Sequence, residues 1–241
     1  MRNEERIVNE IAATLECDIQ VNLHNFPLQL VYDDGVLTME GEVEHIMAKK
    51  RALEAAAAHP RVANIVDRLR IAPAERMQDG EIRDQVCNSL LAKNQLASCT
   101  VRSIVKGKPE VVRDAGRTMT GSIDVEVKDG VVILNGSVSN LTAKRLAGVL
   151  SWWVPGSRDV VNGIEVSPPE EDNDDEVVEA VRLVLEMDPF VNSSQIKVQS
   201  SGYVVMLEGL VKNRLQRQMA EADAWYVFRV DQVVNLLQTE E

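Results

Sequence analysis

The sequence predicts an α+β fold built from three tandem copies of one small unit. A short apolar run that closes in glycine occurs three times, and a stretch with helical apolar spacing precedes each run. The runs are DGVLTMEG (34–41), DGVVILNG (129–136) and GYVVMLEG (202–209), which end at Gly41, Gly136 and Gly209. Nineteen residues after these glycines come Pro60, Pro155 and Phe228, and seven residues further on come Asp67, Asn162 and Asn235. Because no gap is needed in this alignment, the three segments are repeats of one fold.

Each unit is expected to open with a helix. Apolar residues recur there at i, i+4 and i+8, which is the spacing of one buried helix face. These residues are Ile7, Ile11 and Leu15, then Ile82, Val86 and Leu90, then Val177, Val181 and Leu185. Asp79 and Asp175 precede the second and third of these helices and are plausible N-caps.

Two strands joined by a tight turn follow each helix. Asp-Gly at 34–35 and 129–130 is a strong hairpin signal, because glycine tolerates positive φ; in the third unit Gly202-Tyr203 is one place out of step. Each run is followed by a second helix with small residues at i, i+4, such as Ala48 and Ala52, and then by a third strand in VDRLRI, VNGIEV or VNLLQT. A strand–helix–strand crossover places its two strands parallel. Each unit is therefore predicted to be α-β-β-α-β with a three-stranded mixed sheet.

Domains are expected at 1–74, 78–167 and 174–241, joined by APAERMQDG (72–80) and SPPEEDNDDE (167–176). The second linker has two prolines and six acids and is predicted to be a stiff, solvated spacer.

The net charge of −12 is distributed unevenly along the chain. Residues 1–75 carry 8 basic and 13 acidic side chains, residues 76–167 carry 12 and 10, and residues 168–241 carry 6 and 15. Only the middle third is basic.

The composition, 45% hydrophobic and 27% charged residues, is typical of a soluble globular protein. No apolar run approaches the roughly 18 residues of a membrane span. The first residues lack the pattern of a secretory signal, so we expect a cytoplasmic protein, with peripheral membrane association, or a periplasmic one if a signal sequence has been removed. Cys17, Cys87 and Cys99 share no CxxC spacing and are expected to be reduced, inert thiols.

Residues 174–209 resemble the BON domain, a family named for bacterial osmotic-stress and nodulation proteins, and so do 129–148 and the segment VVNGIEV. The resemblance covers nearly the whole chain as three copies. It implies that both helices of each unit lie on one face of its sheet. It also implies a binding module, chiefly for phospholipid membranes. Many relatives are periplasmic or associated with the outer membrane, and some potassium-binding relatives are cytoplasmic.

Catalytic signals are weak. His24, His45 and His59 all lie in the first unit, without HExxH spacing or a nearby pair of cysteines. VKGKPE (105–110) lacks the ends of a phosphate-binding loop. We therefore predict that the protein is not an enzyme and has no catalytic residues, no cofactor and no metal site. Nucleic acid is not an expected partner.

The second unit contains a basic insertion. The distance from the first helix apolar residue to the closing glycine is 34 residues in unit one, 32 in unit three and 54 in unit two. The extra stretch, near 100–121, contains Arg102, Lys106, Lys108, Arg113 and Arg117 against two acids, Glu110 and Asp114. With Gly107 and Pro109 it is predicted to be a mobile loop. It either binds anionic headgroups or an acidic partner, or it is a solvated insertion or contacts the acidic linker of the same chain.

The second helix of unit two carries an additional apolar stripe of Leu146, Leu150 and Trp153, spaced i, i+4, i+7. Such a stripe must be buried against something. A neighbouring unit or a second copy of the chain is the preferred partner, and a membrane interface is the alternative. Trp152 and Trp153 align with Trp225 and Tyr226 of unit three, and Trp152 is predicted to pack toward the sheet.

Three functions remain open. The first is binding of an anionic membrane or of an envelope or stress-related partner through unit two. The second is an interaction scaffold or homo-oligomer, and the third is a sensor of a monovalent cation such as potassium.

Overall fold

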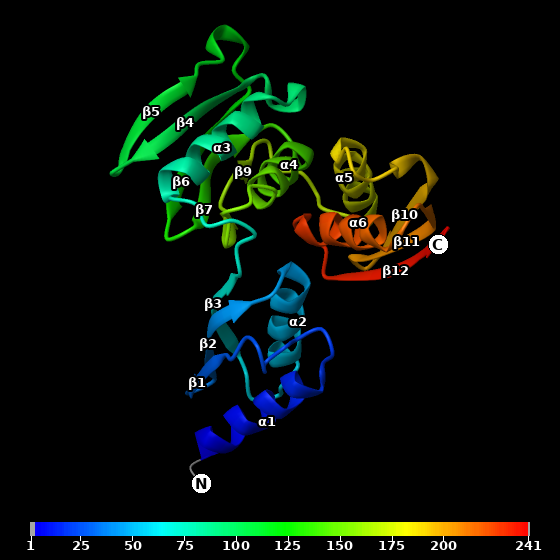
Figure 1. The fold of residues 1–241 in the computed structure, drawn as a ribbon. Helices are drawn as coiled ribbons and strands as arrows, with labels where there is room; N and C mark the ends of the chain where they lie inside the picture. Colours follow the sequence, from blue (N-terminus) through cyan, green and yellow to red (C-terminus); the bar gives the residue numbers. More distant parts are fainter. Residues whose placement is uncertain (1–2, 241) are drawn as a thin grey trace. The chain divides into compact units, whose positions relative to one another are not determined.

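The computed structural model describes residues 3–240 and shows an α+β protein of three repeated domains (Figure 1). The chain forms two compact units, Met1–Ala72 and Pro73–Glu241. The first unit holds domain 1, and the second holds domains 2 and 3. Among the described residues, no helix is long and apolar enough to cross a membrane.

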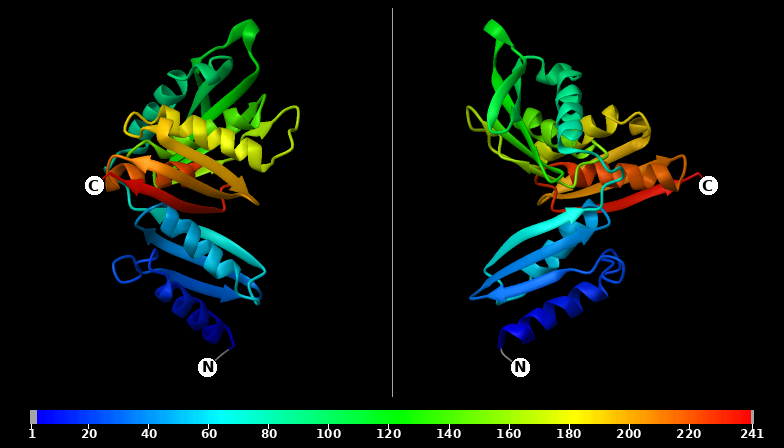
Figure 2. Two further views of the ribbon diagram at one scale, coloured as in Figure 1. Left: turned by 90° about the vertical axis from the view of Figure 1, so that its right-hand side faces the viewer. Right: turned by 60° about the vertical axis from the view of Figure 1, so that its left-hand side comes forward.

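Domain 1 has the predicted order. Its elements are α1 (Asn3–Cys17), β1 (Gln29–Asp33), β2 (Val36–Val43), α2 (Ile46–Ala57) and β3 (Asn64–Ile71). The strands lie in the order β1-β2-β3, with β1 antiparallel and β3 parallel to β2. The predicted apolar face of α1 is buried, with Ile7, Ile11 and Leu15 at most 1% exposed. Figure 2 shows α2 lying against one side of this sheet, in contact with β3.

Domain 3 repeats the same plan. Its elements are α5 (Asp174–Met187), η3 (Ser193–Gln195), β10 (Ile196–Ser201), β11 (Val204–Val211), α6 (Arg214–Tyr226) and β12 (Gln232–Thr239). The strand order is β10-β11-β12, with the same antiparallel and parallel pairings as in domain 1. Gly202 and Tyr203 both have positive φ, as the Asp-Gly pairs do. The turn that the sequence places one residue out of step therefore adopts the same left-handed conformation.

Domain 2 departs from the prediction, because its sheet has six strands rather than three. Its elements are α3 (Asp79–Leu91), η1 (Asn94–Leu96), β4 (Cys99–Val105), β5 (Lys108–Arg113), η2 (Gly116–Thr118), β6 (Gly121–Lys128), β7 (Val131–Val138), α4 (Leu141–Trp152), β8 (Asp159–Asn162) and β9 (Glu165–Val166). The strand order is β5-β4-β6-β7-β8, and β9 also pairs with β7.

The insertion is an ordered β-hairpin and not the mobile loop that its glycine and proline suggest. Lys106 and Gly107 form its turn, both with positive φ. β4 pairs with β5 on one side and, in parallel, with β6 on the other. The alternating residues Cys99, Val101 and Ser103 are buried, so the hairpin extends the core as well as the sheet.

The repeated glycines lie where the second strand of each domain passes close to its neighbour. All three have positive φ: +145° at Gly41, +119° at Gly136 and +139° at Gly209. A Cβ atom at Gly136 would lie 2.1 Å from Ser122 O, and one at Gly209 would lie 1.9 Å from Gln195 O. Ser122 lies on the adjacent strand β6, and Gln195 lies in η3 directly before β10. Because both oxygens belong to the backbone, only glycine fits without a shift of the chain.

The expected N-caps are wrong, by one residue at Asp79 and by two residues at Asp175. The N-cap of α3 is Gln78 and that of α5 is Asn173, whose side chain accepts from Glu176 N. Asp79 and Asp174 are the first helical residues, and each carboxylate accepts two backbone N–H groups from the hairpin turn of its own domain. Asp79 accepts from 129 and 130 at 3.0 and 2.8 Å, and Asp174 accepts from 202 and 203 at 2.8 and 2.9 Å. These acids tie the start of a helix to a turn, a contact that sequence spacing does not show.

Candidate binding surfaces

The five predicted basic residues of the insertion do not act as one group. Arg102 pairs with Asp124 on β6, with Nη2 2.9 Å from Oδ2, and this hydrogen bond raises the pKa of the guanidinium. Arg113 turns back toward the core and donates to the carbonyl oxygens of Leu91, Leu96 and Cys99. Both arginines hold the hairpin on the domain and are not available to a partner.

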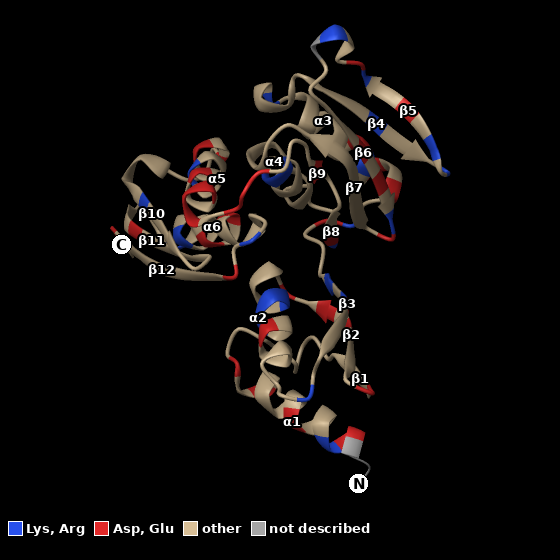
Figure 3. Ribbon diagram, turned by 180° about the vertical axis from the view of Figure 1, so that it is seen from behind, with Lys and Arg blue, Asp and Glu red and all other residues tan. Residues whose placement is uncertain are grey.

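Lys106, Lys108 and Arg117 are exposed. No ion pair of these three is found in the described part of the chain. The two lysines lie at the hairpin turn, and Arg117 lies in η2 after the far end of β5 (Figure 3). Between and beside them are exposed apolar side chains, with Val111 63%, Val112 43% and Met119 58% exposed. The outer strand of domain 2 therefore has two lysines at its turn end and two exposed valines further along, with the exposed acids Glu110 and Asp114 beside them.

The apolar stripe of α4 is not on the surface. Leu146 and Leu150 are 1% and 2% exposed and belong to the core of domain 2. Trp153 is half-buried, and its Nε1 donates to Asp223 Oδ1 of domain 3 at 2.9 Å. α4 packs against both helices of domain 3, α5 and α6. Of the three partners considered, a neighbouring unit, a second copy of the chain and a membrane, it is a neighbouring domain of the same chain that contacts Trp153, while Leu146 and Leu150 pack in the core of domain 2.

Trp152 also reaches domain 3. Its ring stacks on that of Tyr226, with centroids 5.6 Å apart and planes 19° from parallel. Tyr226 is the repeat equivalent of Trp153, so the ends of two equivalent helices meet. In domain 1 the positions equivalent to Trp152 and Trp153 are Ala57 and Ala58, both exposed. Domain 1 thus lacks the aromatic side chains that join domains 2 and 3.

A buried ion pair fastens the acidic linker to α4. Arg145 is 1% exposed, is paired with Asp172 of the linker, and donates from Nε to Phe228 O at 3.3 Å. Lys144 lies over the Phe228 ring, 5.0 Å from its centroid. The linker is therefore part of the interface and not the free, solvated spacer that its composition predicts, and its acids contact α4 rather than the basic hairpin.

Two carboxyl groups meet in this interface. Asp223 and Asp188 are 4% and 8% exposed. Burial, followed by the charge of Asp188, raises the pKa of Asp223 to about 8, although the hydrogen bond from Trp153 acts in the opposite direction. Burial, with a contribution from Asp223, also raises the pKa of Tyr226 to about 12. The protonated form of Asp223 is therefore favoured near pH 7.

Sequence reasoning missed most of this interface, which involves Arg145, Trp152, Asp172, Asp188, Asp223 and Tyr226. One signal was available: Trp152 aligns with Trp225, and Trp153 with Tyr226, at the same helix end in two repeats. The carboxyl pair had no such signal, because 188 caps the end of α5 and 223 lies on α6, and no sequence pattern relates the two positions.

His45 and His59 make local contacts, and Cys87 is buried. His45 Nδ1 accepts from Ala48 N at 3.1 Å and caps α2, and His59 Nε2 lies 3.2 Å from Glu10 Oε2. Burial, followed by the charge of Asp84, raises the pKa of the Cys87 thiol to about 11, which makes it a poor nucleophile at neutral pH. Within residues 3–240 no cluster of three or more His, Cys, Asp or Glu side chains could hold a metal ion.

Comparison with known proteins identifies the repeats. A family model described as "BON domain" matches residues 3–73, 101–168 and 173–241. Among solved structures, the C-terminal domain of CdsD, a structural protein of the type III secretion system of Chlamydia trachomatis, is 13% identical over 98% of this chain and 98% of that chain, with a TM-score of 0.26. A second CdsD structure is 14% identical over 98% and 94%, with a TM-score of 0.24. These scores are too low to transfer a function. No curated protein matches the chain significantly.

Proposed function

The chain belongs to the BON domain family, and on this premise we propose that it is a non-catalytic binding protein that associates with an anionic phospholipid surface through the inserted hairpin of domain 2. The observation that carries the proposal is the exposed inserted hairpin, which places Lys106 and Lys108 at its turn near the exposed side chains of Val111 and Val112. Both features favour the interfacial region of a membrane, where cations meet anionic headgroups and apolar side chains enter the acyl boundary.

The charge distribution supports this surface over others. The chain as a whole carries −12, and its other two domains are acidic. Lys106, Lys108 and Arg117 have no internal ion pair among the described residues, so their charge is available to an external anion. Each basic residue near an anionic bilayer contributes about 1 kcal/mol. Three of them give weak binding, which the exposed acids Glu110 and Asp114 oppose and the exposed side chains of Val111, Val112 and Met119 would strengthen.

The stripe of α4 does not support membrane contact, because Leu146 and Leu150 are buried and Trp153 is bound to domain 3. For the same reason, this stripe does not favour a homo-oligomer. Binding through it would require domains 2 and 3 to separate. The hairpin requires no such opening.

Vesicle flotation with the full chain tests the proposal. The protein should float with phosphatidylglycerol-containing vesicles at low salt and remain at the bottom with phosphatidylcholine alone. The double variant Lys106→Gln/Lys108→Gln should lose about 2 kcal/mol, or roughly 30-fold, in partitioning. Val111→Ser should weaken it further.

Matched controls lie in domain 3. Lys212→Gln/Arg214→Gln makes the same change in charge at exposed positions, and Leu215→Ser removes an apolar side chain with the same 63% exposure as Val111. Both should float like the unchanged protein. Absence of flotation at low salt, or equal losses in the control and hairpin variants, would contradict membrane binding through the hairpin.

A further inference from the structure

Each BON repeat contains one equivalent hairpin, and the first strand of that hairpin is β1 in domain 1, β6 in domain 2 and β10 in domain 3. In domain 2 this strand is not at an edge. β4 lies beside it in parallel, with residue pairs from Cys99↔Gly121 to Ser103↔Val125. Val101 of β4 is fully buried in the domain 2 core. The paired β6 residues are the repeat equivalents of 26–30, so the chain itself shows that the first part of this strand position accepts one more strand.

In domain 3 the same edge is obstructed by a side chain. Arg182 of α5 donates from Nη2 to Val198 O on β10, at 3.4 Å. Val198 is opposite Leu207 in an antiparallel hairpin whose last pair is Ser201↔Val204. Counting back from the turn, Val198 points its carbonyl away from β11. The guanidinium of Arg182 thus occupies an acceptor that an added strand would use.

In domain 1 the edge is open. Among the described residues, β1 pairs only with β2. The tight turn after Asp33 makes Asp33↔Val36 a hydrogen-bonded pair, so Leu30 and Tyr32 direct their N–H and C=O groups away from β2. The repeat equivalent of Arg182 is Ala12, whose methyl group cannot reach the Leu30 carbonyl.

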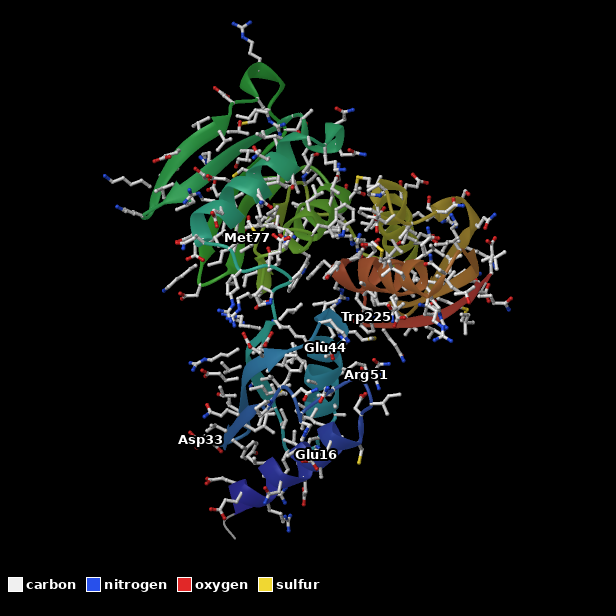
Figure 4. All side chains as sticks on the ribbon, viewed as in Figure 1. Glu16, Asp33, Glu44, Arg51, Met77 and Trp225 are labelled. Carbon is white, nitrogen blue, oxygen red and sulfur yellow. The ribbon has the colours of Figure 1, made fainter. Side chains whose placement is uncertain are left out.

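A groove accompanies this open edge. It has a volume of about 470 Å³ and is lined by Glu4, Glu5, Val8 and Asn9 of α1 and by Leu30, Val31 and Tyr32 of β1. Figure 1 shows α1 running beside β1, and Figure 4 marks the end of β1 at Asp33. The two acids come from the first turn of α1, and they line the same groove as Tyr32 near the C-terminal end of the strand.

We propose that the β1 edge and this groove bind an extended peptide segment of another protein as an added strand parallel to β1. Backbone hydrogen bonds to Leu30 and Tyr32 provide affinity, and alternate small apolar side chains enter the groove beside Val8, as the alternate residues of β4 enter the core of domain 2. The parallel direction places the C-terminal end of the peptide near Glu4 and Glu5. A basic residue at that end is therefore the favoured partner chemistry. This surface is separate from the hairpin and does not depend on membrane binding.

The test uses the full chain and a fluorescent peptide, STVRSIVK, which is the sequence of 99–106 with serine in place of Cys99. Anisotropy should show saturable binding of one peptide per chain, and a scrambled peptide should not bind. Hydrogen exchange at the amides of Leu30 and Tyr32 should slow when the peptide is present. Higher salt should weaken binding, as should Glu4→Gln/Glu5→Gln.

Two substitutions exchange the residues found at the obstructing helix position, so that domain 1 receives the arginine of domain 3 and domain 3 receives the alanine of domain 1. Ala12→Arg introduces the obstruction found in domain 3 and should weaken peptide binding by roughly tenfold or more. Ala13→Arg adds the same charge at the exposed neighbouring position and should leave binding unchanged. Arg182→Ala should open the β10 edge and add a second, weaker peptide site.

The proposal is overturned if the peptide does not bind, if Ala12→Arg and Ala13→Arg bind it equally well, or if the slowed amides lie outside 28–32. It is also overturned if the chain dimerises and Ala12→Arg dissociates the dimer, since the occupant of the edge is then a second copy. Vesicle flotation of Ala12→Arg should equal that of the unchanged chain, which separates this edge from the membrane proposal.

Discussion

At the scale of single residues, the most unusual group is the carboxyl of Asp223. Its Oδ1 accepts from the Trp153 indole, and its Oδ2 has no donor among the described residues. A proton on Oδ2 lets Asp223 donate to the neighbouring Asp188, whose carboxylate also accepts from Phe190 N at 2.8 Å. The neutral acid therefore provides a hydrogen-bond donor to Asp188, whereas the ionised acid would place two negative charges side by side in a buried site.

This arrangement makes stability depend on pH. The pKa of Asp223 is raised from 3.8 to about 8, so the folded protein holds a proton that the unfolded chain releases. The free energy of unfolding should fall as pH rises from about 4 to about 8 and level off above that range. Asp223→Asn keeps the acceptor for Trp153 and supplies a permanent donor to Asp188. Its melting temperature should match that of the unchanged protein near pH 4.5 and exceed it by several degrees near pH 8.5.

Glu186→Gln changes an exposed acid of α5, two residues before Asp188, and serves as the control that should show no such divergence. A constant difference between Asp223→Asn and the unchanged protein across the pH range would show that Asp223 is already ionised in the fold.

At the scale of elements, the close approach between adjacent strands determines where glycine is required. Gly136 on β7 lies opposite Ile123, and Ser122 O would meet its Cβ at 2.1 Å. Gly80 is helical in α3, and a Cβ there would have only a distant contact, Arg83 Nη2 at 3.8 Å. Domain 2 thus requires glycine at position 136 but not at position 80.

Alanine substitution should separate them. Gly136→Ala combines an unfavourable positive φ with a backbone clash and should lower the free energy of unfolding by about 2–4 kcal/mol. Gly80→Ala should be neutral or raise it by up to about 1 kcal/mol, because alanine favours the helix. Urea denaturation of both variants provides the measurement, and similar losses in both would contradict the close approach of β6 and β7.

At the scale of the whole molecule, the repeats differ in how they associate. Domains 2 and 3 share one compact unit, and Met1–Ala72 forms another. Trp152 and Trp153 contact Tyr226 and Asp223 across the shared interface, whereas domain 1 has alanine at both aromatic positions. A few side chains at one helix end thus join two of the three repeats.

We therefore expect domains 2 and 3 to unfold together and domain 1 to unfold separately. In a double-mutant cycle, Trp152→Ala and Tyr226→Ala should show a coupling of about 0.5–1.5 kcal/mol in the unfolding of the joint unit. Phe190→Ala removes an exposed aromatic ring of domain 3 and should show no coupling with Trp152→Ala. Additive effects for Trp152 and Tyr226 would mean that the stacked rings contribute nothing to the interface.

The sequence by itself determined the repeated α-β-β-α-β plan, the three hairpin turns and the closing glycines, because each depends on local periodicity and on backbone conformations that few residues adopt. It also located the insertion and the two tryptophans. It could not show that the insertion forms β4 and β5, since strand pairing depends on which edge is free to receive a strand. Only the tertiary structure decided that Leu146 and Leu150 are buried, that Asp223 meets Asp188, and that the β1 edge stays open where β6 is covered and β10 is obstructed. These features join residues that are far apart in the chain. Their energies come from the burial and proximity of groups on different segments, which the pattern of any single segment does not show.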